Sequence, residues 1–212
     1  MALAAVGLFL IAYQWGNQYQ LAGAGPPSIG GVLIRPPQPL PALDLSGPRG
    51  GLTGDDLLEH WTLIALASPA GAGGHRAVAK LIEVANRLVA EPDLRERLRL
   101  LLISADDAPR LARDFERLTP ELSVLTGGPQ MLERLRAALG AGPAQADAEE
   151  PPALYLIDPK VRLVALFPGA QAPAGIAADI VALDGWPGLL RTAGAGKVPA
   201  GDGGRDAPTD ER

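Results

Sequence analysis

Short apolar runs that alternate with amphipathic segments limit the folds open to this chain. Residues 61–67 (WTLIALA) and 98–104 (LRLLLIS) are each suited to a strand that is buried on both faces. Between these runs, apolar residues recur at helical spacing: Val78, Leu81, Ile82, Ala85, Leu88 and Val89. Pro92 is expected to end that helix. A strand, a helix and a second strand in this order predict a parallel sheet covered by helices.

Signals for further elements flank this central unit. An extended, proline-rich edge segment leads into the first short strand. The other strands are expected at residues 42–46, 123–126, 153–158 and 163–167, the last two as a hairpin. The other helices are expected as a short turn from Thr53 to Leu58, at 108–118, from Pro129 to Leu139, and around Ile176, Ile180 and Leu183. Loops are expected at 47–51, 68–74 and 140–152.

The resulting order predicts an α/β fold, a thioredoxin-like three-layer sandwich. Flavodoxin-like folds share the early strand and helix units but do not normally place two adjacent strands before the last helix. We expect this domain to occupy residues 32–190. Residues 191–212 lack periodicity and are expected to form a disordered tail.

The N-terminal segment has no charged side chain before Arg35, and residues 2–13 are almost continuously apolar. As a helix, this apolar run would span about 18 Å, short of the roughly 30 Å hydrocarbon core of a bilayer. Extending it to Tyr19 adds aromatic residues suited to a membrane interface. We expect a membrane-anchor helix at residues 1–20 and a linker at 21–31. The alternatives are a secretory signal cleaved after residues 22–24 (AGA) and a buried helix of the domain.

Composition removes several function classes. The chain has no Cys, which excludes disulfides, thiolate metal sites, Cys nucleophiles and dithiol redox chemistry. The net charge of −5 argues against a nucleic-acid partner, since binding phosphates requires clustered Lys and Arg. Two His and two Met are the remaining soft metal ligands.

Several segments, in this order, resemble the Sco/SenC family of thioredoxin-fold copper chaperones for cytochrome c oxidase. They lie at 30–45 (GGVLIRPPQPLPALDL), 60–66 (HWTLIAL), 101–109 (LLISADDAP), 125–127 (LTG) and 154–159 (LYLIDP). The resemblance covers residues 31–185. It implies the thioredoxin-like fold and a link to oxidase assembly.

The same resemblance implies a copper site whose three ligands are absent from this chain. The family carries a Cys-x-x-x-Cys-Pro loop after the strand and a distant His before the later hairpin. Here that loop reads SPAGAGGH from Ser68 to His75, and the His position falls near Glu150. Two thiolates and an imidazole make such a site competent for copper. We therefore expect no catalytic, cofactor-binding or metal-ligating residues.

His75 is the strongest remaining metal-ligand candidate, with Glu149 or Glu150 as its partner. We expect instead a solvent-facing His near a helix N-terminus, and His60 at the surface. A site with one imidazole and carboxylates would hold divalent metals weakly and would not select copper. The acidic run Asp147, Glu149 and Glu150 is expected to be a solvated loop.

Other motifs in the sequence each lack a residue that the corresponding chemistry requires. Ser68 lacks the G-x-S-x-G frame of a nucleophile elbow, and no His follows His75. Residues 71–74 (GAGG) lack the third Gly of a dinucleotide fingerprint, although their N–H groups would suit an anion. Residues 194–197 (GAGK) are followed by Val198 instead of the Ser or Thr of a P-loop. Asp106 and Asp107 are expected to cap a helix.

These observations predict a non-catalytic, Sco-like protein without cofactor, anchored in the inner membrane with its domain facing the periplasm. Its expected role is that of an accessory or scaffold factor in respiratory cytochrome oxidase assembly. The expected partners are the membrane and oxidase subunits or assembly factors. The alternative function is a periplasmic binding protein that retains a weak metal or anion site at the Ser68–His75 loop.

Overall fold

Parallel strands occupy the centre of the computed structural model, which describes residues 25–142 and 152–191. They are β4 (Trp61–Leu66), β5 (Leu98–Ser104) and β6 (Leu122–Gly127). Antiparallel strands extend the sheet on both sides: β1 (Val32–Pro39), β2 (Asp44–Gly47), β3 (Gly50–Thr53), β7 (Leu154–Ile157) and β8 (Arg162–Phe167). Within the described residues, the eight strands form one sheet in the order β1-β8-β7-β4-β5-β6-β2-β3.

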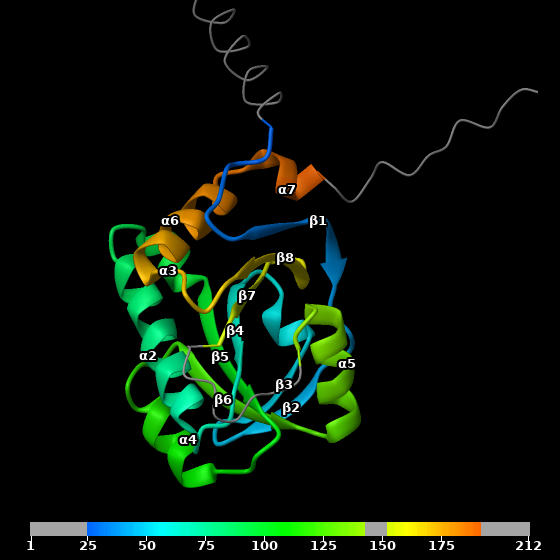
Figure 1. Cartoon of the computed structure of the whole chain (residues 1–212), viewed down its shortest axis with the longest axis vertical. Coiled ribbons are helices and arrows are strands. Elements are labelled where there is room, and N and C mark those ends of the chain that lie inside the picture. The colour runs from blue at the N-terminus through cyan, green and yellow to red at the C-terminus, as the bar shows by residue number, and fades with distance from the viewer. Residues whose placement is uncertain (1–24, 143–151, 192–212) are drawn as a thin grey trace, which may run out of the picture.

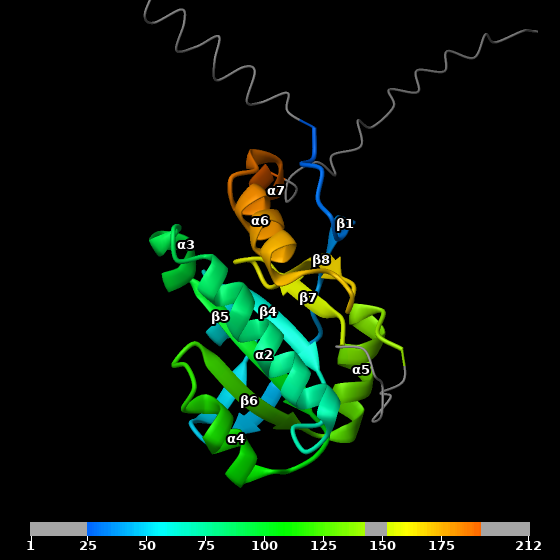
Figure 2. The same ribbon diagram turned by 60° about the vertical axis from the view of Figure 1, so that its left-hand side comes forward.

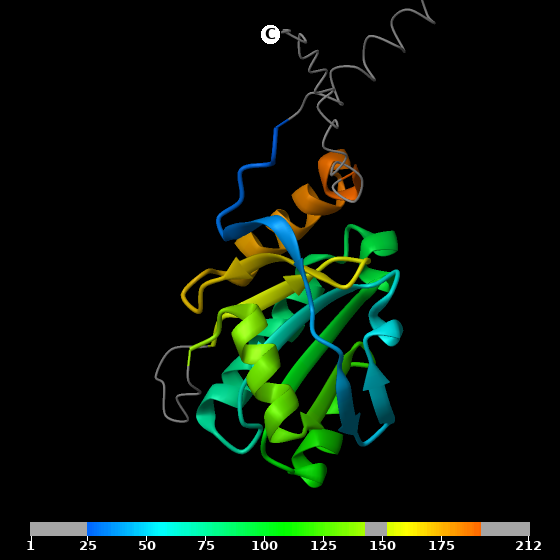
Figure 3. The same ribbon diagram turned by 90° about the vertical axis from the view of Figure 1, so that its right-hand side faces the viewer.

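Helices cover both faces of this sheet, as Figures 1 and 2 show. One face packs against α2 (Ala72–Arg87), α4 (Pro109–Glu116) and α6 (Pro173–Asp184). The other face packs against α5 (Pro129–Leu139), which Figure 3 shows in front of the sheet. Three short elements complete the described part: η1 (Asp55–Leu57), α3 (Pro92–Glu96) and α7 (Pro187–Arg191).

The alternation of side chains along the central strands produces two separate cores. Leu63 of β4 and Leu100 of β5 point into the core beneath α2 and α6. Ile64 and Leu101, their neighbours in the chain, point into the core beneath α5. Because successive side chains of a strand face opposite sides, a strand between two helical layers must be apolar at nearly every position. The expected layered α/β architecture is confirmed.

The segment before β4 differs from the prediction. Residues 47–51 were expected to form a turn, but Gly47, Gly50 and Gly51 lie in strands, and β2 and β3 form a hairpin. Leu45 pairs with Leu52 across this hairpin, and both side chains are buried. A Cβ on Gly47 would lie 2.7 Å from the carbonyl oxygen of Val124, which explains a glycine inside a strand here.

Several helix limits also need correction. Helix α2 begins at Ala72, inside the expected loop, and ends at Arg87, so Pro92 does not end it. Pro92 instead occupies the first turn of α3, where its missing N–H costs nothing. Helix α4 ends at Glu116 and not at residue 118.

The expected capping of α4 by Asp106 and Asp107 is wrong. The N-cap is Ala108, which makes no side-chain capping bond, and Pro109 begins the helix. The N–H of Asp106 instead donates to the Ser104 hydroxyl at 2.9 Å. Proline supplies the helical φ angle at the first position, so no carboxylate cap is required.

The termini lie largely outside the described residues, including the expected anchor at 1–20. None of the described helices combines the length and apolar character needed to cross a bilayer. The linker predicted at 21–31 is described from Gly25 onward, and its last residues, Gly30 and Gly31, bond to α6. Helix α7 includes Arg191, the last residue that the structure describes.

Candidate functional site

The segment from Ser68 to His75 follows the carboxyl end of β4. The N–H of Gly71 donates to the carbonyl oxygen of Ser68 at 3.2 Å, and the N–H groups of Gly74 and His75 donate to Gly71 at 3.1 and 3.4 Å. The loop proper is therefore short, and the glycines that follow Gly71 already belong to the first turn of α2.

Gly74 allows this loop to fold back onto the helix. A Cβ at this position would lie 2.0 Å from the carbonyl oxygen of Ser68 and 2.9 Å from the Cα of Pro69. Pro69 is buried in the same contact. The segment is thus closed by backbone packing, and the close approach accounts for a glycine inside the first turn of α2.

His75 is exposed near the N-terminus of α2, as predicted. Its ring meets the ring of Phe115 edge-on, with centroids 5.0 Å apart and an interplanar angle of 85°. Glu149 and Glu150, its proposed partners, lie outside the described residues, as do Asp147 and residues 194–197.

The donor groups of this segment do not fit a thiolate-held copper ion. Between Ser68 and His75 the side chains offer a single hydroxyl and a single imidazole, and backbone carbonyls provide the remaining oxygens. Cu(I) selects soft sulfur ligands, which these groups do not supply. Across residues 25–142 and 152–191, no three His, Cys, Asp or Glu side chains are grouped so that they could hold a metal ion.

Asp106 and Asp107 are exposed between β5 and α4. They line a small cavity of about 120 Å³ together with Pro69 and Thr126. Apart from these two carboxylates, the cavity wall carries no titratable side chain.

His60 was expected at the surface, where it is only partly exposed. The side chain is half-buried, and its Nδ1 lies 2.7 Å from the carbonyl oxygen of Leu58. Its Nε2 lies 3.3 Å from an Nη atom of Arg99. Sequence reasoning missed this pair, because the parallel pairing of β4 with β5 is what places the two residues side by side.

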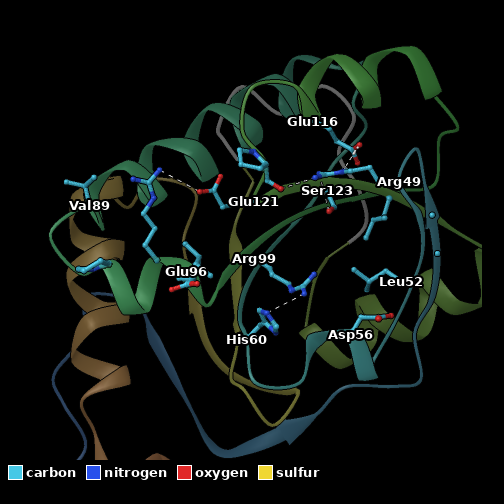
Figure 4. Close-up of a pocket in the computed structure, with 17 residues that line it drawn as sticks. Arg49, Leu52, Asp56, His60, Val89, Glu96, Arg99, Glu116, Glu121 and Ser123 are labelled. Atoms are coloured by element: carbon cyan, nitrogen blue, oxygen red, sulfur yellow. Dashed lines mark hydrogen bonds and ion pairs between the residues drawn. The ribbon is translucent and has the colours of Figure 1, made fainter.

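His60 and Arg99 line a groove of about 730 Å³ at the amino-terminal ends of β4 and β5. Figure 4 shows their side chains pointing toward each other, with Val89 and Leu52 at opposite ends of the groove. Arg99 gave a sequence signal for this feature, because it is a charged residue inside an otherwise apolar strand. The remaining wall comes from segments that only the fold brings together.

Two ion pairs brace the wall of this groove. Arg49 Nε lies 3.1 Å from Glu116 Oε2, and an Nη atom of Arg49 donates to the carbonyl oxygen of Pro120 at 2.9 Å. Arg95 and Glu121 lie 3.6 Å apart. The hydrogen bond that Thr119 donates, helped by the charge of Arg95, lowers the pKa of Glu121.

Comparison with known proteins identifies the fold. No family model matches the sequence, and no curated protein matches it. Apo Sco1 from Thermus thermophilus is similar in structure at a TM-score of 0.59 and 20% identity, covering 74% of this chain and 97% of that one. Yeast Sco1 with copper bound gives 0.55 at 18% identity, covering 68% and 87%. A thioredoxin-family thiol:disulfide interchange protein from Chlorobium tepidum gives 0.50 at 9% identity, covering 70% and 97%.

These similarities define a mixed α/β, thioredoxin-like fold. More particularly, it is the fold of the Sco proteins, so the predicted resemblance to the Sco/SenC family is confirmed at the level of the fold.

Proposed function

We propose that this chain is a degenerate member of the Sco family that acts without catalysis as an accessory or scaffold factor in cytochrome c oxidase assembly. The proposal is supported by the fold, since the match spans 97% of Thermus thermophilus Sco1. It is supported equally by the ordered series of Sco-like segments in the sequence. Fold similarity alone does not transfer function, so the site must decide what is carried over.

The observation that carries the proposal is the absence of Cys from all 212 residues of a chain with a Sco fold. The similar Sco structures from yeast and Arabidopsis thaliana are described with copper bound, and a Sco protein named BsSco is described with a disulfide switch. Without a thiol, this chain has neither thiolate ligands nor a dithiol pair. What remains for such a domain is recognition of a partner.

The proposed partner is an oxidase subunit or another assembly factor, because BsSco is described as a member of a family of cytochrome c oxidase assembly proteins. We further propose that residues 1–20 anchor the chain in the inner membrane with its domain in the periplasm. The uncharged, apolar character of that segment supports this placement.

Copper titration of the purified full chain tests the loss of the site. Competition against a chromogenic Cu(I) chelator should show no transfer of copper from chelator to protein. Stoichiometric Cu(I) binding at sub-micromolar affinity would overturn the claim. His75→Ala distinguishes a residual site: if weak metal binding is seen and this variant abolishes it, the Ser68–His75 loop still holds a metal.

Deletion of the gene in the source organism tests the partner. We expect lower levels of assembled oxidase, restored by the wild-type gene but not by added copper. Rescue by copper would indicate delivery of the metal and would contradict a scaffold role. Normal oxidase in the deletion strain would remove the partner assignment altogether.

Protease treatment of spheroplasts tests the placement. An anchored domain that faces the periplasm should be digested while the inner membrane stays sealed, and the chain should remain with the membranes after a high-salt wash. Protection of the domain, with a cytoplasmic marker equally protected, would contradict the proposed orientation.

A further inference from the structure

The groove at the amino-terminal ends of β4 and β5 lies at the opposite end of these strands from the Ser68–His75 segment. Its volume of about 730 Å³ falls within the range typical of small-molecule sites, roughly 300–1,000 Å³. The proposed scaffold function makes no use of this groove.

The charge on Arg99 is what distinguishes this groove from a merely irregular surface. Of the guanidinium groups that line it, those of Arg49 and Arg95 have carboxylate partners. Arg99 makes no ion pair to any residue in the described ranges, although its side chain is half-buried. A partly desolvated cation without a carboxylate partner favours an anionic ligand.

His60 does not supply the missing negative charge. Its Nδ1 donates to the carbonyl oxygen of Leu58, so its Nε2 is the acceptor for the Arg99 N–H. The hydrogen-bond network therefore assigns a neutral imidazole beside the guanidinium. The ring therefore holds Arg99 by a hydrogen bond and adds no negative charge beside it.

The other carboxylates on the wall are engaged or exposed. Asp56 Oδ2 accepts hydrogen bonds from the N–H of Thr53 at 2.7 Å and from its hydroxyl at 2.9 Å. These bonds lower the pKa of Asp56, to which Arg99 adds only a smaller contribution. Glu96 is exposed to water. Neither carboxylate forms an ion pair with Arg99.

Two buried polar atoms lie at paired positions of β4 and β5, next to the groove. Arg99 Nε and Thr62 Oγ1 have no hydrogen-bond partner among the described residues. These two residues are direct partners in the register of β4 and β5. Because Arg99 Nε is closed off from solvent, the two Nη atoms are the donors that can meet the two oxygens of a carboxylate in the groove.

Apolar side chains line part of the groove wall. Val89, which is 66% exposed, lines it together with Pro92 and Pro120. A large exposed aliphatic group beside a concave polar floor suits a ligand that is apolar at one end and charged at the other.

We propose that this groove binds a small organic acid, with its carboxylate on Arg99 and its apolar body against Val89, Pro92 and Pro120. Benzoate is the simplest probe of this chemistry, and benzamide is its uncharged counterpart of nearly the same shape. Inorganic phosphate distinguishes an organic acid from an anion of any kind.

The test is a titration of the ¹⁵N-labelled full chain, followed by amide chemical shifts. Benzoate should shift the amides of Arg99, Ser123 and Leu52 in a saturable way, and benzamide should bind at least about tenfold more weakly, because only the anion gains charge-assisted bonds. Equal binding of benzoate and benzamide, no saturable shift at the groove, or saturable binding of phosphate alone would overturn the proposal.

Substitutions of Arg99 then test whether its charge binds the ligand. Arg99→Gln should weaken benzoate binding at least about tenfold, and Arg99→Lys should fall between it and the wild type, because the charge stays and the planar fork is lost. Arg134→Gln removes an exposed arginine of α5 and should leave binding unchanged. Wild-type affinity in a folded Arg99→Gln protein would contradict the assignment, and the comparison of benzoate with benzamide decides the matter even if that variant does not fold. Copper plays no part in these measurements, so their outcome is independent of the proposed function.

Discussion

The carboxylate of Asp179 on α6 accepts a hydrogen bond from the backbone N–H of Gly30 at 3.0 Å. The N–H of Gly31 and the amide nitrogen of Gln171 donate to the same carboxylate at 3.1 and 2.8 Å. Asp179 is buried, and these hydrogen-bond donors stabilise its carboxylate in place of water. The end of the expected linker is thereby fixed to the last long helix.

Asp179→Ala should destabilise the domain by about 1–3 kcal/mol, because three donors lose their acceptor in a partly buried place. Urea denaturation of the full chain measures this change. Asp107→Ala removes an exposed carboxylate and is the matched control, expected to stay within about 0.5 kcal/mol of the wild type. Equal stability of both variants would show that the Gly30 contact does not hold the segment.

Gly73 and Gly74 provide a matched pair within one turn of α2. A Cβ on Gly74 would meet the backbone of Ser68, so Gly74→Ala should destabilise the domain by about 1–3 kcal/mol through overpacking. A Cβ on Gly73 meets nothing within 4 Å, so Gly73→Ala should stabilise the helix by about 0.5–1 kcal/mol. Thermal unfolding of both variants gives the comparison. A neutral Gly74→Ala would mean that the loop does not pack on the helix as described.

The burial of Lys80 predicts that the free energy of unfolding depends on pH. Its buried Nζ donates to the carbonyl oxygens of Pro168 and Gly169 at 3.2 and 2.6 Å, and burial lowers its pKa from the ordinary 10.5. Between the lowered value and 10.5, the unfolded chain binds more protons than the folded one. The free energy of unfolding should therefore rise as the pH increases through this window and level off above it.

Denaturation at a series of alkaline pH values measures that slope. Lys80→Met should remove the rise, whereas Lys160→Met, which replaces an exposed lysine, should keep it. A slope that persists in Lys80→Met would assign the effect to another group.

Thiolates placed in the Ser68–His75 segment should restore copper binding. Ser68→Cys combined with Ala72→Cys recreates the Cys-x-x-x-Cys spacing and supplies the soft ligands that Cu(I) selects. Competition titration should then show stoichiometric Cu(I) binding that the wild type lacks. The control carries Cys at Ala79 and Ala137, exposed positions on α2 and α5, which lie on opposite faces of the sheet. Equal copper binding by both variants would show that the position of the thiols does not matter.

Strands and helices with a strong local pattern of apolar residues were predicted correctly, and those with a weak pattern were missed. Strands β4 and β5 were predicted because both of their faces are buried, which forces a continuous apolar run. Strand β3 was missed because it contributes only Leu52 to the core and begins with two glycines. The caps of α4 were misassigned because Asp106 and Asp107 match a common capping pattern, whereas Pro109 already sets the start of the helix.

The amino-acid sequence alone determined the layered α/β architecture and the lack of thiol chemistry, since both follow from residue type and from periodicity along the chain. The tertiary structure decided which distant side chains become neighbours. His60 meets Arg99 because β4 and β5 pair in parallel, and Arg49 reaches Glu116 because the β2–β3 hairpin lies next to β6. Strand register sets these contacts, and register depends on the packing of the whole sheet, which no local stretch of sequence encodes.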